Sequence, residues 1–348
     1  FFICSVFQAA NLPDPHRDPH GEMSKERRRG YVSHPLRRSL GSSLHLPMMQ
    51  KWVEYVRRAS GDSCIWNTGH QYGDWLALDA GEGNYTGASR KNFIATAFYA
   101  HSAQLLAQAM DALDMDGAAY HRLFEAIRAA HQNAFPDCRT QTECALALHF
   151  GLAAAPDRVA AQLAELVRSN GNRLTTGFVG TPYLLHALSE NGYAQTAYDL
   201  LLQTKAPSWL FSVKMGATTV WEHWDSRKAD GSFWSTDMNS FNHHAYGAVA
   251  DWLYAAAGGI RPGKPGYETV TFAPVPDRRL QRFEVVVNTP HGKVCSCWKW
   301  NGPTVTYVLT TPVSAEIRLG GEQHNVAAGT YTFVRGDTTN RRMKQRIF

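Results

Sequence analysis

Apolar residues recur every three to four positions along much of the chain, which is the spacing of amphipathic helices. In residues 92–114 the apolar stripe consists of Ile94, Phe98, Leu105, Ala109 and Leu113. The helical pattern begins with MMQKWVEYVRRAS at 48–60, and similar patterns predict helices at 118–135, 141–152, 157–170, 181–190, 193–203 and 243–257. The segments between these helices are rich in Gly, Trp, Asp, His and Thr, a composition typical of loops that carry binding and catalytic residues.

Beyond about residue 260 the helical period gives way to strict alternation. Residues 282–321 alternate β-branched and polar residues, with turn residues roughly every eight to twelve positions. This pattern predicts a small antiparallel β-sandwich. We therefore expect a mainly α protein with a C-terminal β domain, divided into residues 46–260 and 261–348.

The first 45 residues match neither period and are rich in Pro, His, Arg and Ser. We expect residues 1–45 to be disordered or foreign to the fold, although an ordinary basic tail would have the same composition. Much of the formal charge of +5 is concentrated there, and the rest of the chain is nearly balanced. The charge pattern therefore gives no indication of nucleic-acid binding.

The opening sequence FFICSVFQAA is apolar, but it has no initiating Met and no basic segment before it. It is therefore a poor signal peptide, and we expect a cytoplasmic location. No stretch approaches the roughly twenty apolar residues that a membrane span needs, so no membrane partner is expected. The sequence does not predict an oligomeric state.

The six cysteines, at positions 4, 64, 138, 144, 295 and 297, show no metal-binding spacing. We therefore expect reduced thiols and no metal site. Cys295 and Cys297 should lie on one face of a strand, too close along it for an ordinary disulfide.

A glutamate flanked by tryptophans is the most distinctive chemical feature. The sequence GATTVWEHWDS, residues 216–226, places Glu222 between Trp221 and Trp224. Aromatic faces with polar edges suit sugar rings, and the chain contains ten Trp and fourteen Tyr. Hydrolysis of a glycosidic bond needs one carboxylic acid and a second carboxylate that attacks or activates water. Glu222 is thus a candidate base or nucleophile; a helix cap or a buried ion pair is the alternative.

Two further loops contain residues that could complete such a site. The segment YGDWLALD holds Asp74 and Trp75, and the segment MNSFNHHAYG holds His243. Asp74 could be the second carboxylate or could cap its loop, and His243 could bind a sugar hydroxyl or belong to the core. Asp225 is interpreted first as a turn residue.

Six motifs carry a resemblance to a known family: GDWLALD, LTTGFVGTPYLLHALSENGY, PSWLFSVKMGATTVWEHWDS, DGSF, MNSFNHHAYGAVADWLY and GGIRP. Over roughly residues 47–310 the chain resembles the C-terminal part of the α-L-rhamnosidases of glycoside hydrolase family 78. The resemblance implies an (α/α)6 barrel followed by a small β-sandwich. It also implies inverting hydrolysis that releases L-rhamnose from glycosides without a cofactor.

The resemblance also implies roles for individual residues. The Glu of the family motif TxWExWD is the general base that activates water, and it corresponds to Glu222. The GDW loop, the tryptophans of TxWExWD and the His of SFNHxxYG are expected to line the rhamnose pocket. The pocket residues implied in this way are Asp74, Trp75, Trp221, Trp224 and His243.

The sequence departs from the family upstream of the GDW loop. The family has there a segment of the form CPQRDExLGWTGD, which supplies the general-acid glutamate, and the 348 residues contain no such segment. The predicted helices also fall short of the six pairs in a closed barrel. We therefore expect an incomplete barrel and impaired catalysis, because losing acid assistance typically costs about 10²–10⁴-fold.

Two alternatives remain open beside an impaired rhamnosidase. A non-catalytic sugar-binding protein or a truncated remnant would keep the aromatic pocket without the acid. Another (α/α)6 hydrolase, acting on glucosides or uronides, is disfavoured by the run VWEHWDS…SFNHHAYG. In each case the expected partner is a carbohydrate.

Overall fold

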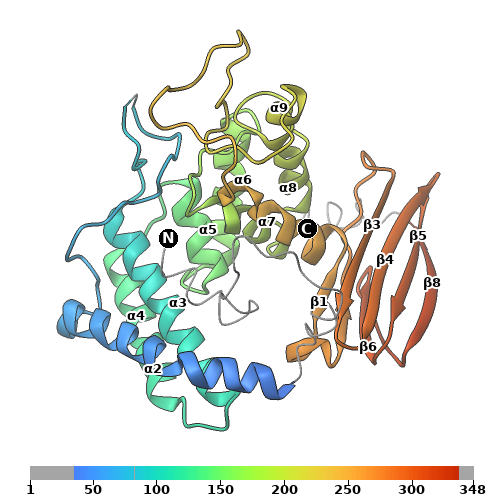
Figure 1. Ribbon diagram of the computed structural model, residues 1–348, viewed down its shortest axis with the longest axis horizontal. Helices are drawn as coiled ribbons and strands as arrows, with labels where there is room; N and C mark the ends of the chain where they lie inside the picture. Colours follow the sequence, from blue (N-terminus) through green and yellow to red (C-terminus); the bar gives the residue numbers. More distant parts are fainter. Residues whose placement is uncertain (1–34, 82, 337–348) are drawn as a thin grey trace, which may run out of the picture. The chain divides into compact units, whose positions relative to one another are not determined.

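The computed structural model describes residues 35–81 and 83–336, with side chains described from residue 45 onward. Within these residues the chain separates into a helical unit that ends at Ala248 and a β unit that begins at Val249. Figure 1 draws the helical unit in blue to gold and the β strands in orange to red.

The helical unit confirms most of the predicted helices to within a few residues. Its helices are α2 (Pro35–Ser60), α3 (Lys91–Asp111), α4 (Ala118–Ala134), α5 (Gln141–His149), α6 (Pro156–Ser169), α7 (Thr181–Glu190), α8 (Ala194–Leu201) and α9 (Trp209–Lys214). Helix α9 has no counterpart among the predicted helices, because its 6 residues are too few to show a period. Helix α2 begins before the expected boundary at residue 46, and residues 1–34 lie outside the described part of the chain.

The predicted helix at 243–257 consists of three short segments. These are the 3-10 helix η3 (Ala245–Ala248), helix α10 (Val249–Trp252) and the π-helix η4 (Leu253–Ala257). The change of hydrogen-bond pattern along this stretch explains why apolar spacing alone predicts one continuous helix.

Helix α3 lies at the centre of the first helices and packs against α2, α4 and α5. Its fully buried face is rich in alanine, with Ala97, Ala100, Ala103 and Ala107 all at 0% exposure. Because alanine has almost no side chain, neighbouring helices can approach closely along this face. The larger residues of the predicted stripe, such as Phe98 and Leu105, are only half-buried. The helix was therefore predicted correctly, but its most buried face was not.

A buried ion pair joins the start of α3 to the start of α5. The Glu143 side chain is fully buried, and its Oε2 lies 2.7 Å from Nη2 of Arg90. Its Oε1 accepts a bond from the Arg90 backbone N–H at 2.9 Å, and the hydroxyls of Ser89 and Thr140 are 2.7 Å apart. Thr140 also caps α5 by accepting from the Glu143 backbone N–H. These bonds fix the end of the loop 64–90, which carries the GDW sequence.

The β unit consists of two four-stranded sheets, ordered β1-β2-β6-β7 and β3-β4-β5-β8. The strands are β1 (Ile260–Pro262), β2 (Val270–Phe272), β3 (Arg282–Thr289), β4 (Gly292–Asn301), β5 (Thr304–Thr311), β6 (Ala315–Leu319), β7 (Glu322–Val326) and β8 (Gly329–Gly336). Buried residues of both sheets, among them Phe272, Ile317, Trp298 and Leu309, form one hydrophobic core. The predicted sandwich is confirmed, with one difference: β2 and β6 pair in parallel, in the register Val270↔Ala315.

None of the helices within residues 35–81 and 83–336 is long and apolar enough to cross a membrane. The five cysteines of the described part are free. Cys295 and Cys297 are both half-buried on one face of β4, whereas Ser296 between them is buried.

Candidate active site

The carboxylate of Asp74 is completely buried and bonded on both oxygens. Its Oδ1 accepts from the backbone N–H groups of Val179, at 2.7 Å, and Gly180, at 3.2 Å. Its Oδ2 accepts from the backbone N–H of Gly177, at 2.8 Å, and from the hydroxyl of Thr142. Burial raises the pKa of Asp74 above its ordinary value, although these four donors oppose the shift. Asp74 therefore joins its loop to the turn before α7, as in the loop-cap alternative that the sequence left open.

The turn 177–180 has no space for side chains at its two glycines. A Cβ at Gly177 would lie 2.2 Å from the carbonyl oxygen of Trp75, and one at Gly180 would lie 2.9 Å from Oδ2 of Asp74. The backbone N–H of Phe178 also donates to the Trp75 carbonyl at 2.9 Å. Direct backbone contact between the two loops thus requires glycine at position 177, whereas at position 180 a Cβ would collide with the side chains of Thr142 and Asp74.

Phe178, in the turn that Asp74 holds, packs against His243. The two rings are stacked, with centroids 4.8 Å apart and planes at 20°. Phe178 also meets Tyr246 edge to face, at 5.3 Å and 66°. Asp74 holds the turn, and the turn places Phe178 as the wall against which the imidazole lies.

The hydrogen bonds of His243 assign its tautomer. Its Nδ1 accepts from the backbone N–H of Ala245 at 3.3 Å, and its own backbone N–H donates to the Val220 carbonyl at 2.8 Å. Burial lowers the pKa of His243, and the nearby Glu222 carboxylate opposes that shift. A neutral ring that accepts at Nδ1 carries its proton on Nε2. Within the described part of the chain Nε2 has no protein acceptor, so it can donate to a ligand hydroxyl.

Glu222 is half-buried and held by the backbone of Ser240. Its Oε2 accepts from the Ser240 N–H at 2.8 Å, and its own N–H donates to the Ser240 carbonyl at 2.8 Å. Its negative charge also opposes the lowering of the pKa of His223, which burial causes. No donor to Oε1 is present among the described residues, so this oxygen can accept a proton from a bound water.

Trp221 and Trp224 line a cavity of about 260 Å³ together with Trp209 and Tyr246. Trp224 is stacked on Tyr246, at 3.9 Å and 22°, and meets Trp209 edge to face, at 5.1 Å and 89°. Burial raises the pKa of Tyr246 well above its ordinary value, and the carboxylates of Asp74 and Glu222 add to the shift. The two predicted tryptophans thus form the apolar wall of a cavity whose lining includes neither Glu222 nor His243.

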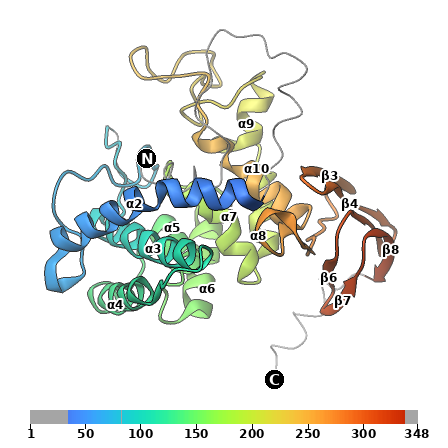
Figure 2. The same cartoon turned by 60° about the horizontal axis from the view of Figure 1, so that its bottom comes forward.

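Trp75 belongs to a different aromatic group from Trp221 and Trp224. It is half-buried and contacts Tyr72, at 6.0 Å, and Tyr85, at 5.7 Å. The loop 64–90 and the loop 216–244 lie on the same side of the helical unit in Figures 1 and 2. The structure therefore brings Glu222 and His243 together and keeps Trp75 on the neighbouring loop.

Three contributors to the site escape sequence reasoning: Phe178, Ser240 and Tyr246. Ser240 acts through its backbone, which no sequence motif reveals. Phe178 lies between glycines in TGFVG, and Tyr246 ends the motif FNHHAYG, so both were within recognised segments. An aromatic residue enclosed by glycines was the available signal for Phe178.

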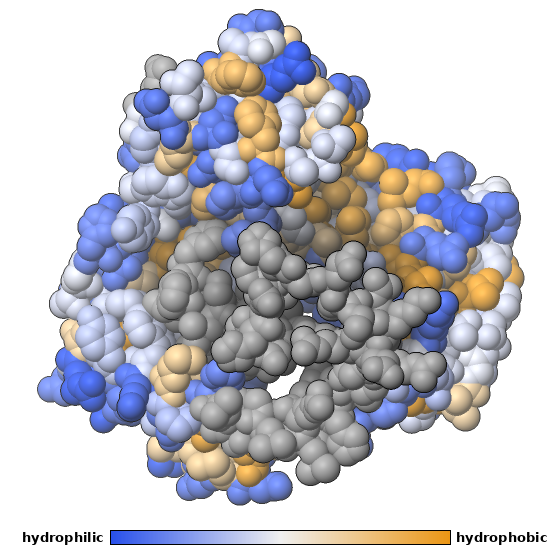
Figure 3. All heavy atoms as spheres, in the orientation of Figure 1, coloured by the Kyte–Doolittle hydropathy of each residue, from blue (hydrophilic) through white to orange (hydrophobic). Residues whose placement is uncertain are grey.

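The surface near the site mixes apolar and polar side chains. Figure 3 shows hydrophobic residues exposed among hydrophilic ones at the top of the view, over α9 and the loop 216–244. The exposed apolar residues there include Val213, Val220, Phe233 and Phe241. Across the described ranges no group of three His, Cys, Asp or Glu side chains is arranged to hold a metal ion.

Comparison with known families identifies this arrangement. Residues 43–257 match the bacterial α-L-rhamnosidase 6-hairpin glycosidase domain, and residues 259–331 match the bacterial α-L-rhamnosidase C-terminal domain. The chain belongs to the bacterial α-L-rhamnosidase family. The resemblance noted in the sequence is therefore confirmed, and so is the fold class of a helical glycosidase domain followed by a β domain.

Individual rhamnosidases support the assignment. An α-L-rhamnosidase of Formosa agariphila is 36% identical over 285 residues, which cover 78% of this chain and 31% of that protein. One of Streptomyces avermitilis is 35% identical over 305 residues, covering 84% of this chain and 28% of that protein. The chain thus spans about a third of the length of these relatives.

Solved rhamnosidase structures share the fold. The Streptomyces avermitilis α-L-rhamnosidase complexed with L-rhamnose aligns with a TM-score of 0.78 and 31% identity, over 85% of this chain and 31% of that one. The native α-L-rhamnosidase from Aspergillus terreus aligns with a TM-score of 0.79 and 29% identity, over 87% of this chain and 37% of that one.

Proposed function

We propose that this rhamnosidase-family chain binds terminal α-L-rhamnose and carries the water-activating half of an inverting glycoside hydrolase, with Glu222 as the general base. The observation that carries the proposal is the geometry of the Glu222 carboxylate. Ser240 fixes Oε2, while Oε1 has no donor among the described residues. A base needs such a fixed carboxylate with one oxygen available to water.

The neighbouring groups supply what a sugar at this site would need. The Nε2–H of His243 can donate to a sugar hydroxyl, and Trp221 and Trp224 line an apolar cavity in the same loop. In the reaction Glu222 would take a proton from water as the water oxygen attacks the anomeric carbon. The bond to the leaving group would break on the opposite face of the sugar ring.

The leaving-group side of this reaction is proposed to be impaired in the 348-residue chain. Protonating the departing oxygen requires a carboxylic acid, and the sequence contains no CPQRDExLGWTGD-like segment to supply it. Asp74 is an unsuitable substitute because protein donors occupy both its oxygens. We therefore expect turnover only of substrates whose leaving group departs as a stable anion.

Hydrolysis of 2,4-dinitrophenyl and phenyl α-L-rhamnosides by the purified chain tests this proposal. The dinitrophenyl substrate should be turned over and the phenyl substrate should not, because only the former needs no acid assistance. Glu222→Gln should reduce turnover by about 10²–10⁴-fold. Glu165→Gln, at an exposed glutamate of α6 that pairs with Arg168, should have no effect. Unchanged turnover in Glu222→Gln would refute the role of the base.

A non-catalytic sugar-binding role is the second candidate, favoured by the complete engagement of Asp74 within the fold. The two functions differ in the response of the folded chain to the dinitrophenyl substrate. Binding of methyl α-L-rhamnoside without turnover, retained in Glu222→Gln, would support the binding role and exclude catalysis by this chain.

A further inference from the structure

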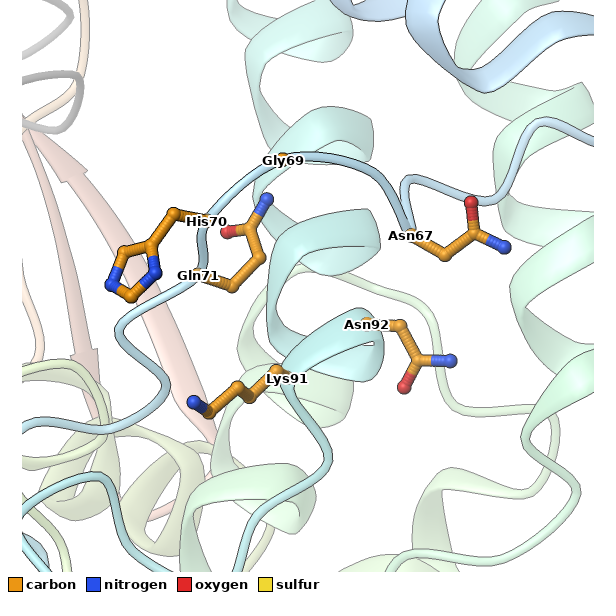
Figure 4. Close-up of a pocket in the computed structure, with 6 residues that line it drawn as sticks. All are labelled: Asn67, Gly69, His70, Gln71, Lys91 and Asn92. Carbon is orange, nitrogen blue, oxygen red and sulfur yellow. The ribbon is translucent and has the colours of Figure 1, made fainter.

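Glu222 lines neither of two cavities on this side of the helical unit. One is the aromatic cavity of about 260 Å³ described above, and the other is a polar pocket of about 420 Å³ on the loop 64–90. Figure 4 shows that the polar pocket is formed by the segment 67–71 and the first turn of α3. The contacts that position the Glu222 carboxylate come instead from its own segment, residues 222–240.

The segment 222–240 doubles back, so that its two ends are hydrogen-bonded to each other. The Glu222 N–H donates to the Ser240 carbonyl at 2.8 Å, and the Ser240 N–H donates to Oε2 of Glu222 at 2.8 Å. Nδ2 of Asn239 adds a bond to the Ser226 carbonyl at 2.8 Å. The carboxylate therefore keeps its position only while the returning end of the segment stays in place.

The side chain of His223 also reaches across to the returning end. It is buried, with 5% of its surface exposed, and its Nε2 lies 3.1 Å from the carbonyl oxygen of Met238. Because a carbonyl oxygen can only accept, Nε2 carries the proton. Burial lowers the pKa of His223, which favours the neutral ring with its single proton on Nε2. The imidazole thus holds the backbone two residues before Ser240.

Both the backbone and the ring of His223 are fixed by further contacts. Its N–H donates to Oγ of Ser226 at 3.1 Å, and that hydroxyl donates to the His223 carbonyl at 3.2 Å. The imidazole is stacked on Trp234, with centroids 3.5 Å apart and planes at 18°. The stack holds the plane of the ring, so that Nε2 stays within hydrogen-bond distance of Met238.

We propose that His223 is a positioning residue for the general base. Its Nε2–H bond to Met238 holds the returning end where the Ser240 N–H can fix Oε2 of Glu222, which leaves Oε1 available to water. His223 therefore acts through Ser240 and does not contact the sugar. This inference rests on the proposed function for the role of Glu222, but the anchoring of the carboxylate can be measured without turnover.

Two substitutions at His223 separate the hydrogen bond from the ring. His223→Phe keeps a ring on Trp234 and loses the donor, whereas His223→Gln loses the ring and keeps an N–H donor near the position of Nε2. With 2,4-dinitrophenyl α-L-rhamnoside, kcat should fall about tenfold in His223→Phe while KM changes less than about twofold, because the sugar contact at His243 is unchanged. His223→Gln should recover most of kcat. His291→Phe, at an exposed histidine in the turn between β3 and β4, should match the unsubstituted chain.

Hydrogen exchange of the peptide that contains Ser240, followed by mass spectrometry, measures the anchoring independently of turnover. Exchange should be about tenfold faster in His223→Phe, the value of one lost hydrogen bond, and unchanged in His223→Gln. Unchanged kcat or unchanged exchange in His223→Phe, or an equal loss in His223→Gln, would overturn the positioning role. A folded unsubstituted chain without turnover would refute the proposed function, and the exchange rates alone would then decide whether His223 anchors Glu222.

Discussion

Two carboxylates beside tryptophans occupy opposite environments in this molecule. Asp74 is fully buried, and four protein donors bond its two oxygens. Glu222 is half-buried, with one oxygen fixed by Ser240 and the other without a donor in the described residues. A carboxylate that accepts protein hydrogen bonds on both oxygens stabilises the fold. A carboxylate with one oxygen hydrogen-bonded and the other available can act as a base. The sequence context, a carboxylate next to Trp, is the same in both.

The largest expected effect is a difference in the free energy of unfolding between variants at the two carboxylates. Asp74→Ala leaves three backbone N–H groups without an acceptor, two of them in buried bonds and that of Val179 in a part-buried one. Each buried unpaired group costs about 1–3 kcal/mol. We expect the free energy of unfolding to fall by about 3–5 kcal/mol, while Glu222→Gln changes it by less than about 1 kcal/mol. Urea unfolding followed by circular dichroism measures both. Equal losses in the two variants would contradict the division of roles.

A second prediction concerns the acid stability of the helices that frame the site. Burial, followed by the charge of Arg90, lowers the pKa of His131 from 6.5 to about 4. Between these values the unfolded chain binds more protons than the folded one, so stability is present above about pH 6.5 and is lost as pH falls toward 4. A shift of this size corresponds to about 3 kcal/mol. Unfolding free energies measured at pH 7 and pH 4 should show the loss.

Two variants test whether His131 causes this dependence. His131→Phe keeps an aromatic ring beside Phe93 and Phe135 and should reduce the slope between pH 4 and pH 6.5. A residual slope should remain, because burial also lowers the pKa of His101 to about 4. His121→Gln, at an exposed histidine of α4, should leave the slope unchanged. A slope in His131→Phe as steep as in the unsubstituted chain would assign the acid sensitivity to other groups.

The smallest predicted effect tests the donor proposed at His243. His243→Phe keeps the stack on Phe178 and removes the Nε2–H group. Loss of one hydrogen bond should weaken methyl α-L-rhamnoside binding about tenfold, or about 1.4 kcal/mol. Calorimetric titration measures this affinity, and the thermal midpoint should change little. Unchanged affinity would remove His243 from the sugar contacts.

The elements with a clear local period were predictable from the sequence, and those set by long-range contacts were not. Helices α4 and α7 were expected almost at their observed bounds, because their apolar stripes repeat over several turns. The parallel pairing of β2 with β6 joins strands that are distant in the chain, and alternation within a strand carries no information about its partner.

The residues of the candidate site likewise include some that the sequence predicts and some whose roles depend on long-range contacts. Glu222 and the tryptophans beside it were recognisable as a motif. The role of Asp74 depends on N–H groups of the turn 177–180, and the support of His243 depends on Phe178 in that turn. A single sequence does not show which distant turn meets a given carboxylate, so Asp74 could be noticed but not assigned.

The backbone contact between the GDW loop and the turn 177–180 has an evolutionary consequence. Any side chain at Gly177 would collide with the Trp75 carbonyl, so selection for folding alone preserves this glycine together with Asp74. Oε1 of Glu222 accepts no hydrogen bond from the described residues, so folding does not depend on it. In a lineage released from selection for hydrolysis, the position of Glu222 is expected to drift first, while GDW and TGFVG persist as a record of ancestry rather than of activity.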